Sequence, residues 1–314
     1  MVLTKHTIII AAVFVATELQ AVRAVDYLGG WLSAAPTEQC VDICVNSKTT
    51  PTCLTSDPAC VAKLQRPGDF DYLLLEQIYM PQFCRDLLVG VDSTISHQNV
   101  SVYPNGLTCQ PDVVKSELTI HGLWPNYNDG YAGCCNVSDT IGNHPYNAFN
   151  FAVNQEPLLA KMSEKWIDPT QSNAYETLCQ IYNHEFQKHG ICYYAAEDNW
   201  EQSAVTYFQA TLNAAATLDS ATKQINEWAA SSAAEAPTPA AIRALYPKYT
   251  QVLCSAVDGV NHLSAIRTCY TKPANITNEG PFMQQDCALP TATTTFALCN
   301  ESTPVSLAAY VAPQ

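Results

Sequence analysis

Residues 118–125 read LTIHGLWP, a short stretch in which polar and apolar side chains alternate before a tryptophan and a proline. A period of two is typical of a β-strand with one buried face. It places Thr119 and His121 on one face and the apolar pair Leu118 and Ile120 on the other. His121 is therefore expected to leave the sheet opposite the apolar pair, and the strand is expected to end at the tryptophan and proline.

Strand-like and helix-like patterns elsewhere in the chain do not alternate regularly, and no internal repeat or low-complexity linker divides it. The predicted elements are strands at 70–75 and 118–123, a loop at 126–133, and helices at 157–166, at 175–189, at 208–228 with a break near 219–220, and from Thr238 toward Cys254. This order favours an α+β fold, with a central antiparallel sheet flanked by helices, over a parallel sheet.

A second stretch, at 184–192, reads HEFQKHGIC and concentrates titratable side chains. If it is a helix, Glu185 lies beside Lys188 and His189, and His184 lies beside Lys188. All four side chains can then point into one cleft. The glycine that follows them suits a helix end, so the helix is expected to end there.

The same stretch nearly spells the zinc-binding helix His-Glu-x-x-His. However, the residue four positions after His184 is Lys188, a cation that does not bind metal while it is protonated. His189 is expected to be turned off the face of His184. The sequence therefore predicts no metal site and no cofactor, and a metalloenzyme is the less favoured alternative.

The first 24 residues have the pattern of a secretory signal peptide. Basic residues precede an apolar run at 7–17, and Ala24 offers a small residue for cleavage, with Ala21 as the alternative. About ten apolar residues are too few to span a bilayer, and no later segment is longer. We expect export without membrane insertion, either out of the cell or through the same route to a vacuole or lysosome.

Fourteen cysteines suit that compartment, because exported chains keep disulfides that the cytosol would reduce. Four of them lie at 25–67, where apolar periodicity is weak, and predict a small disulfide-stapled extension packed on the main domain. The alternative is an independent module that binds a protein or a cell-surface partner. The expected organisation is a signal peptide at 1–24, a Cys-rich extension at 25–67, a main domain at 68–302 and a tail at 303–314.

The 314 residues carry 15 basic and 29 acidic side chains, a net charge of -14, without any Lys/Arg-rich run. Such a chain does not hold nucleic acid by a broad basic surface, because counterion release would contribute little affinity. A polyanion must be bound locally, preferably at low pH where histidines are charged. Possible N-glycosylation sites, which mark surface loops, are Asn99, Asn136, Asn275 and Asn300.

Taken together, the stretches 118–125 and 184–192 resemble the two active-site segments of the ribonuclease T2 family. The resemblance covers roughly residues 70–299. It implies a secreted or vacuolar endoribonuclease with an α+β fold, an acid optimum and no metal. Its expected substrate is single-stranded RNA, not DNA, which such enzymes cleave through a 2',3'-cyclic phosphate to 3'-phosphate ends.

The resemblance also implies a role for each titratable residue. His189 matches the family's general base, His121 the general acid, and His184 a phosphate-binding histidine. Glu185 and Lys188 match the pair that stabilises the transition state. The chemistry agrees, because this cleavage needs a base for the 2'-hydroxyl, an acid for the leaving 5'-oxygen and positive charge around the phosphorane.

Trp124 matches an aromatic residue that lines the base or phosphate site, and Asn126 together with Tyr127 or Tyr131 offers further base contacts. The alternative for Trp124 is a core tryptophan at the end of a strand. Met80 departs from the family, because many relatives have the tryptophan of a Gln-Trp-Pro element at this place. This departure affects the family's other base subsite. The loop after the strand also differs from that of better-known members, so no base preference is predicted.

The resemblance further implies a set of disulfide bridges and a monomer. The implied bridges are Cys192 with Cys134 or Cys135, and a nested set among Cys254, Cys269, Cys287 and Cys299. The alternative to a ribonuclease is a secreted binding or signalling glycoprotein. In that case residues 25–67 would bind a host or cell-surface partner, and the nuclease activity would be secondary.

Overall fold

The computed structural model describes most of the chain from residue 50 onward. The described residues are 40, 43–44, 50–91, 100–138, 141, 146–171, 178–197, 199–231, 236–255, 260–278, 280, 282–288 and 297–313. The expected signal peptide and the site at Asn99 lie outside them. Within these residues, no helix has the length and apolar character needed to span a membrane.

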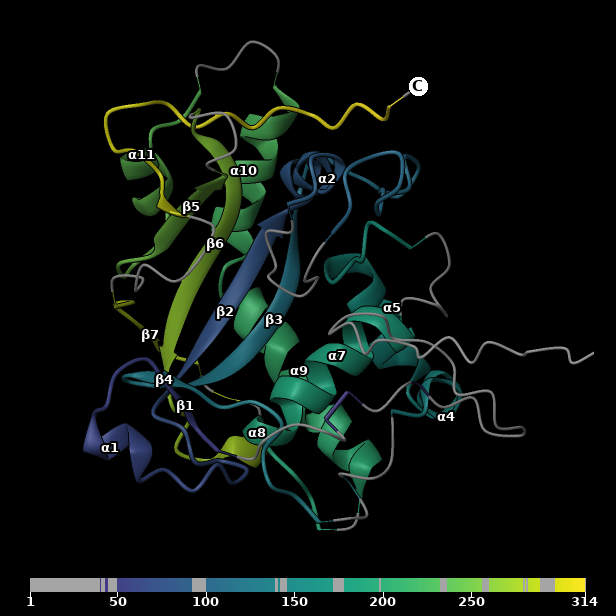
Figure 1. The fold of residues 1–314 in the computed structure, drawn as a ribbon, viewed down its shortest axis with the longest axis vertical. Helices are drawn as coiled ribbons and strands as arrows, with labels where there is room; N and C mark the ends of the chain where they lie inside the picture. Colours follow the sequence, from purple (N-terminus) through teal and green to yellow (C-terminus); the bar gives the residue numbers. More distant parts are fainter. Residues whose placement is uncertain are drawn as a thin grey trace, which may run out of the picture.

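An antiparallel sheet forms the centre of the fold (Figure 1). In spatial order its strands are β1 (Thr52–Cys53), β4 (Gly130–Tyr131), β3 (Leu118–Tyr127), β2 (Tyr72–Tyr79), β6 (His262–Thr271), β5 (Gln251–Ser255) and β8 (Ala297–Leu298), and β7 (Gln284–Gln285) pairs with β6. All these pairs are antiparallel. The predicted α+β class with a central antiparallel sheet is confirmed.

Helices flank the sheet and connect its strands. They are α1 (Pro58–Val61), α2 (Met80–Leu88), α4 (Ala148–Asn154), α5 (Glu156–Lys165), α9 (Trp200–Ala216), α10 (Asp219–Ala230), α11 (Pro239–Arg243), the 3-10 turn η3 (Ile276–Asn278), and a helical run made of η1 (Leu178–Tyr182), α7 (Asn183–Glu185), η2 (Phe186–Gly190) and α8 (Ile191–Tyr193). The long helices α9 and α10 lie behind the sheet in Figure 1 and contact it at β3.

The core lies between these helices and one face of the sheet. Tyr207 and Phe208 of α9 pack against Trp166, with ring centroids 6.3 and 5.7 Å apart. Leu73 and Leu75 of β2 belong to the same buried cluster. Because side chains alternate along a strand, the residues between and beyond these leucines face the opposite side of the sheet, where the site described below lies.

The predicted strand at 118–123 is present, but it continues through the tryptophan and proline to Tyr127. Pro125 is tolerated inside it because β4 pairs only with Asn126 and Tyr127, so one edge of β3 is open at the proline. The strand predicted at 70–75 is β2, which begins and ends later. The loop predicted at 126–133 contains the short strand β4.

Among the predicted helices, the start at Thr238 is confirmed, since its hydroxyl oxygen accepts a hydrogen bond from the Ala241 amide at 3.1 Å. The predicted continuation toward Cys254 is wrong: α11 ends at Arg243 and the chain then forms β5. Buried pairing of β5 with β6 and β8 outweighs the local helical pattern. The break predicted near 219–220 lies slightly earlier, between α9 and α10.

Seven disulfides connect the described cysteines, and none of the fourteen is free. The pairs are Cys40–Cys179, Cys44–Cys134, Cys53–Cys60, Cys84–Cys109, Cys135–Cys192, Cys254–Cys299 and Cys269–Cys287. Cys135, and not its neighbour, is the partner of Cys192, and the C-terminal pairs are nested as the resemblance implied. The cysteines at 40 and 44 tie the N-terminal extension to the rest of the protein.

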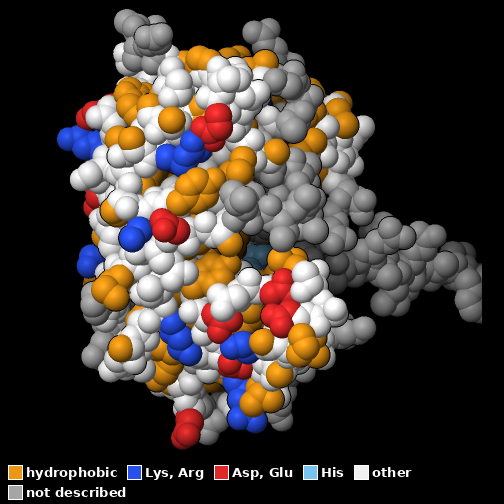
Figure 2. Space-filling view, turned by 90° about the vertical axis from the view of Figure 1, so that its left-hand side faces the viewer, with side chains coloured by type: hydrophobic (Ala, Val, Ile, Leu, Met, Phe, Trp, Pro, Cys, Tyr) orange, Lys and Arg blue, Asp and Glu red, His pale blue; other side chains and the backbone are white. Residues whose placement is uncertain are grey.

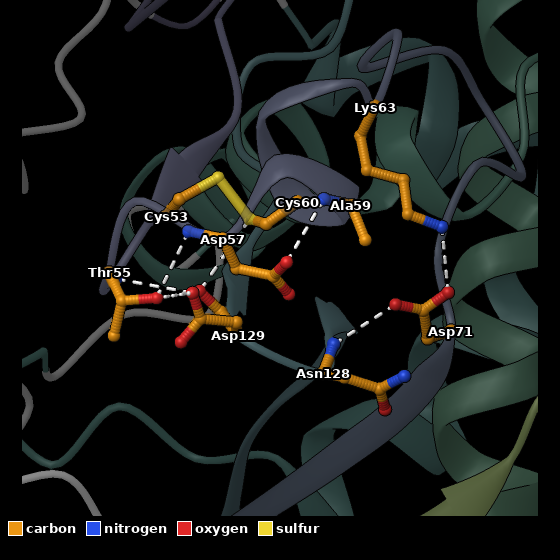
Figure 3. The surroundings of a disulfide bond; sticks show 9 residues. All are labelled: Cys53, Thr55, Asp57, Ala59, Cys60, Lys63, Asp71, Asn128 and Asp129. Carbon is orange, nitrogen blue, oxygen red and sulfur yellow. Dashed lines mark hydrogen bonds and ion pairs between the residues drawn. A yellow bond between two sulfur atoms is a disulfide. The ribbon is translucent and has the colours of Figure 1, made fainter.

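The extension also packs against the edge of the sheet (Figure 3). Its strand β1 pairs with β4, and the Cys53–Cys60 bridge closes the loop that carries α1. Lys63 forms an ion pair with Asp71 at 2.8 Å, on the segment that leads into β2 (Figure 3). A strand pairing, an ion pair and two disulfides thus hold the described part of the extension in place.

Candidate active site

The helical run at 178–193 contains two π-helical turns, η1 and η2. In a π-turn the hydrogen bonds join residues five apart, so side chains five apart share a face. His184 and His189 consequently lie together, with ring centroids 6.3 Å apart. The expectation that His189 is turned off the face of His184 is therefore wrong, because it assumed ordinary helical spacing.

The expected helix end at Gly190 is also wrong. Gly190 has helical backbone angles, with φ at -61° and ψ at -40°, and the helix continues through Tyr193. A Cβ at this position would lie 2.7 Å from the ring of Tyr207 and 2.8 Å from the ring of Phe186. The glycine therefore serves close packing of this helical run against α9, and not a left-handed cap.

A β-bulge places His121 in the site. Glu76 pairs with Gly122 and Gln77 pairs with Ile120, so His121 is the extra residue of β3. A bulge shifts the alternation by one residue, which puts His121 and Trp124 on the same side of the sheet. Their ring centroids are 5.0 Å apart. His121 leaves the sheet opposite the apolar pair, as predicted.

The structure brings both predicted segments together around the carboxylate of Glu185. The indole Nε1 of Trp124 donates to Oε2 of Glu185 at 2.8 Å, and Nε2 of His121 lies 3.5 Å from Oε1. The ring of His189 lies on Trp124, with centroids 5.4 Å apart. Asn126 is half-buried, and its Nδ2 donates to the carbonyl oxygen of Trp124 at 2.9 Å.

Gly122 gives this carboxylate room to approach β3. A Cβ there would lie 1.9 Å from Oε2 of Glu185 and 2.5 Å from Nε1 of Trp124. Any side chain at this position would therefore occupy the place of the carboxylate. Glycine is required here for a close approach between the strand and α7.

Burial shifts the pKa values of Glu185 and His189 in opposite directions. Burial raises the pKa of Glu185 to about 7, although His121, the Trp124 hydrogen bond and Lys188 act against it. Burial also lowers the pKa of His189 well below its usual range, and the nearby positive charges of Lys188 and His184 add to this effect. Burial thus favours the neutral form of both groups.

Two residues that the sequence reasoning missed extend the site across the sheet. Oε1 of Glu76 on β2 lies 2.7 Å from Nδ1 of His121, and its other oxygen accepts from Nε of Arg267 on β6. The Arg267 guanidinium also lies 5.8 Å from the centroid of the Trp124 ring. A glutamate directly after the apolar run Leu73 to Leu75 of β2 was the available signal, because a buried charge needs a partner.

One group among the described residues meets the distance requirement for a metal ion. The potential ligand atoms of His184, Glu185 and His189 all lie within 4.8 Å of one another. The π-turn creates this arrangement, which ordinary helical spacing would not. The ammonium of Lys188 acts on Glu185 and His189, so a second cation would be repelled here.

Part of the site reaches the molecular surface. Figure 2 shows a hollow with a histidine side chain at its bottom and acidic side chains on its rim. Among the predicted residues, Lys188, Trp124 and Asn126 are partly exposed, whereas His121, His184, Glu185 and His189 are buried. The partly exposed residues are thus placed to meet a ligand first.

An antiparallel sheet, seven disulfides and a buried cluster of histidines and carboxylates define a disulfide-rich α+β protein with acid–base groups at one site. The chain belongs to the ribonuclease T2 family. The model of the family, described as "Ribonuclease T2 family", matches residues 70–286. The resemblance seen in the two sequence stretches is confirmed.

Individual relatives match a shorter part. The chain is 30% identical to "Ribonuclease 1" of Arabidopsis thaliana over 146 residues, which cover 46% of this chain and 50% of that protein. It is 28% identical to "Extracellular ribonuclease LE" of Solanum lycopersicum, over 42% of this chain and 46% of that protein. The chain thus spans about half the length of these relatives. The crystal structure of human RNase T2 aligns with a TM-score of 0.47 and 18% identity, over 75% of this chain and 97% of that chain.

Proposed function

We propose that the protein is an exported endoribonuclease that cleaves single-stranded RNA without a metal, through a 2',3'-cyclic phosphate. The observation that carries this proposal is the meeting of His121 and His189 at one carboxylate, Glu185, in different electrostatic surroundings. Pairs of titratable groups whose surroundings shift their pKa values apart are typical of general acid and general base roles.

His189 is the general base in this proposal. Burial and the neighbouring positive charges lower its pKa and favour the neutral imidazole, the form that can take the proton of the 2'-hydroxyl. His121 is the general acid. Its Nδ1 lies 2.7 Å from Glu76, whose carboxylate stays ionised, and this charge favours the imidazolium that protonates the leaving 5'-oxygen.

The remaining residues stabilise the phosphorane. Lys188 and His184 supply positive charge, and Glu185, with a pKa of about 7, is a neutral acid at pH 5 that does not repel the phosphate. Hydrogen bonding to the developing charge is the main contribution expected from such groups.

Trp124 and Asn126 are the proposed substrate contacts. Trp124 is partly exposed at the site and touches both catalytic histidines, which supports a binding role over a purely core role. Stacking of a base on an aromatic ring is worth about 1–3 kcal/mol. Asn126 lies two residues further along the same face of β3 and offers a polar contact.

The test is cleavage of a short single-stranded RNA at pH 5 in EDTA by the wild type and by His189→Ala, with identification of the product ends. We expect cyclic-phosphate ends and a loss of about 10²- to 10⁴-fold in the variant. His262→Ala, which removes a histidine at the start of β6, is the control and should keep the activity. Activity that EDTA abolishes and zinc restores would instead favour the metal cluster of His184, Glu185 and His189.

The second candidate is an exported binding glycoprotein. Three of its possible glycosylation sites, Asn136, Asn275 and Asn300, are exposed, which is compatible with this candidate. Deleting the extension is a poor test, because it would leave Cys134 and Cys179 unpaired. No cleavage by folded, fully disulfide-bonded wild type would favour this candidate over the nuclease.

A further inference from the structure

Four ionisable side chains form a row that crosses the sheet and ends in the site. Arg267 on β6 donates to Glu76 on β2, Glu76 contacts Nδ1 of His121 at 2.7 Å, and Nε2 of His121 faces Glu185 at 3.5 Å. The row is possible because Arg267 and Glu76 are paired in register, and because the bulge adds His121 beside Glu76.

Glu76 is shielded from water and still charged. It is 1% exposed and His121 is 2% exposed. Burial acts to raise the pKa of Glu76, but the Arg267 charge and the hydrogen bond and charge of His121 outweigh it, so the pKa lies below its ordinary value. An ionised carboxylate only accepts hydrogen bonds, so the atom facing it on His121 must carry a proton.

We propose that Glu76 is a positioning residue for the general acid: it holds a proton on Nδ1 of His121 and thereby directs Nε2 to the leaving oxygen, while Arg267 keeps Glu76 ionised. This inference rests on the proposed ribonuclease function. The carboxylate does not touch the substrate, since the imidazole lies between them. It acts as a carboxylate does behind a catalytic histidine, by selecting the tautomer and stabilising the imidazolium.

The proton balance requires this tautomer. The 2'-oxygen bonds to phosphorus as its proton passes to His189, and the bond from phosphorus to the 5'-oxygen breaks as Nε2 of His121 gives up its proton. His121 is then neutral with its remaining proton on Nδ1, held by Glu76, and Nε2 is free to take a proton from water in the hydrolytic step. The titratable groups that act on His121 include Glu76 on β2, Glu185 on α7 and His189 on η2.

The decisive variant is Glu76→Gln, which keeps the shape of the side chain. Arg267 holds the amide oxygen, so the amide NH₂ turns toward Nδ1 of His121 and removes the proton from that atom. For RNA we expect kcat to fall by about 10²- to 10⁴-fold, with the alkaline limb of the pH profile moved to lower pH. Uridine 3'-(p-nitrophenyl phosphate), whose leaving group needs no proton, should lose far less.

Asp86→Asn is the matched control. Asp86 is likewise 1% exposed and hydrogen-bonded, to Gln82 and Ser255, but it belongs to α2 and β5 contacts outside the site. This control should leave both rates close to those of the wild type. Thermal unfolding of each variant shows whether the fold is kept. An equal loss on both substrates in folded Glu76→Gln, or no loss on either, would overturn the inference.

A second readout does not depend on activity. Nitrogen NMR of the His121 ring should show Nδ1 protonated in the wild type and the proton moved to Nε2 in Glu76→Gln. A wild-type ring without a proton on Nδ1 would overturn the role of Glu76, whatever the rates. If the wild type cleaves no RNA, the ribonuclease proposal fails, and the ring measurement still decides whether Glu76 orients His121.

Discussion

Replacing Gly122 by alanine should disable the site through one methyl group. The new Cβ would lie 1.9 Å from Oε2 of Glu185, whereas ordinary contact begins at 3.4 Å. The carboxylate must therefore retreat by about 1.5 Å, and a misplacement of about 1 Å can cost about 10²-fold in rate. We expect kcat for RNA at pH 5 to fall by about that factor, with a smaller change in KM.

Stability should fall as well, because the retreat breaks the 2.8 Å hydrogen bond from Trp124 to Glu185. An unsatisfied buried polar group costs about 1–3 kcal/mol, which urea denaturation measures. Gly133→Ala is the matched control. Its Cβ would lie 3.8 Å from the Lys188 side chain, in ordinary contact, so rate and stability should stay close to wild type. A fully active Gly122→Ala would refute the placement of Glu185 against β3.

Two further predictions concern pH. Trp124→Phe keeps an aromatic ring but removes the hydrogen bond that lowers the pKa of Glu185. That pKa should rise above about 7, and the alkaline limb of the pH profile of kcat should move to higher pH. An alkaline limb that does not move would contradict the role of Glu185 as a neutral acid. The folded-state pKa of Glu185, about 7, exceeds its unfolded value of about 4.3. Its contribution to stability is therefore complete below pH 4.3 and lost as the pH rises through 7. Between pH 5 and pH 8, the free energy of unfolding measured by urea denaturation should decrease less for Glu185→Gln than for the wild type.

Local patterns in the sequence were sufficient for the fold class and for most of the predicted site. Alternation at 118–123 predicted the strand β3, and Thr238 before Pro239 predicted a helix start, because both depend on neighbours in the chain. The even number of cysteines allowed the seven bridges that the structure contains. The two histidine segments pointed to the family, which the match over residues 70–286 confirms.

Long-range pairing decided the rest. The strand β5 lies in a stretch for which a helix was predicted, and it pairs with β6 and β8 along its two edges. The bulge at His121 depends on the register between β2 and β3, so the sequence of β3 alone does not reveal it. Local pattern rules do not include register, since it depends on segments far apart in the chain.

The amino-acid sequence by itself determined the two histidine-containing segments at 118–125 and 184–192, the strand pattern at 118–123 and a number of cysteines sufficient for seven bridges. Only the tertiary structure decided how they meet. The π-turn joined His184 to His189, and the sheet joined Glu76 to Arg267, which are 191 residues apart. Pairs such as Glu76 and Arg267 form only in the folded chain, because a charged group that becomes buried is costly unless an opposite charge lies beside it.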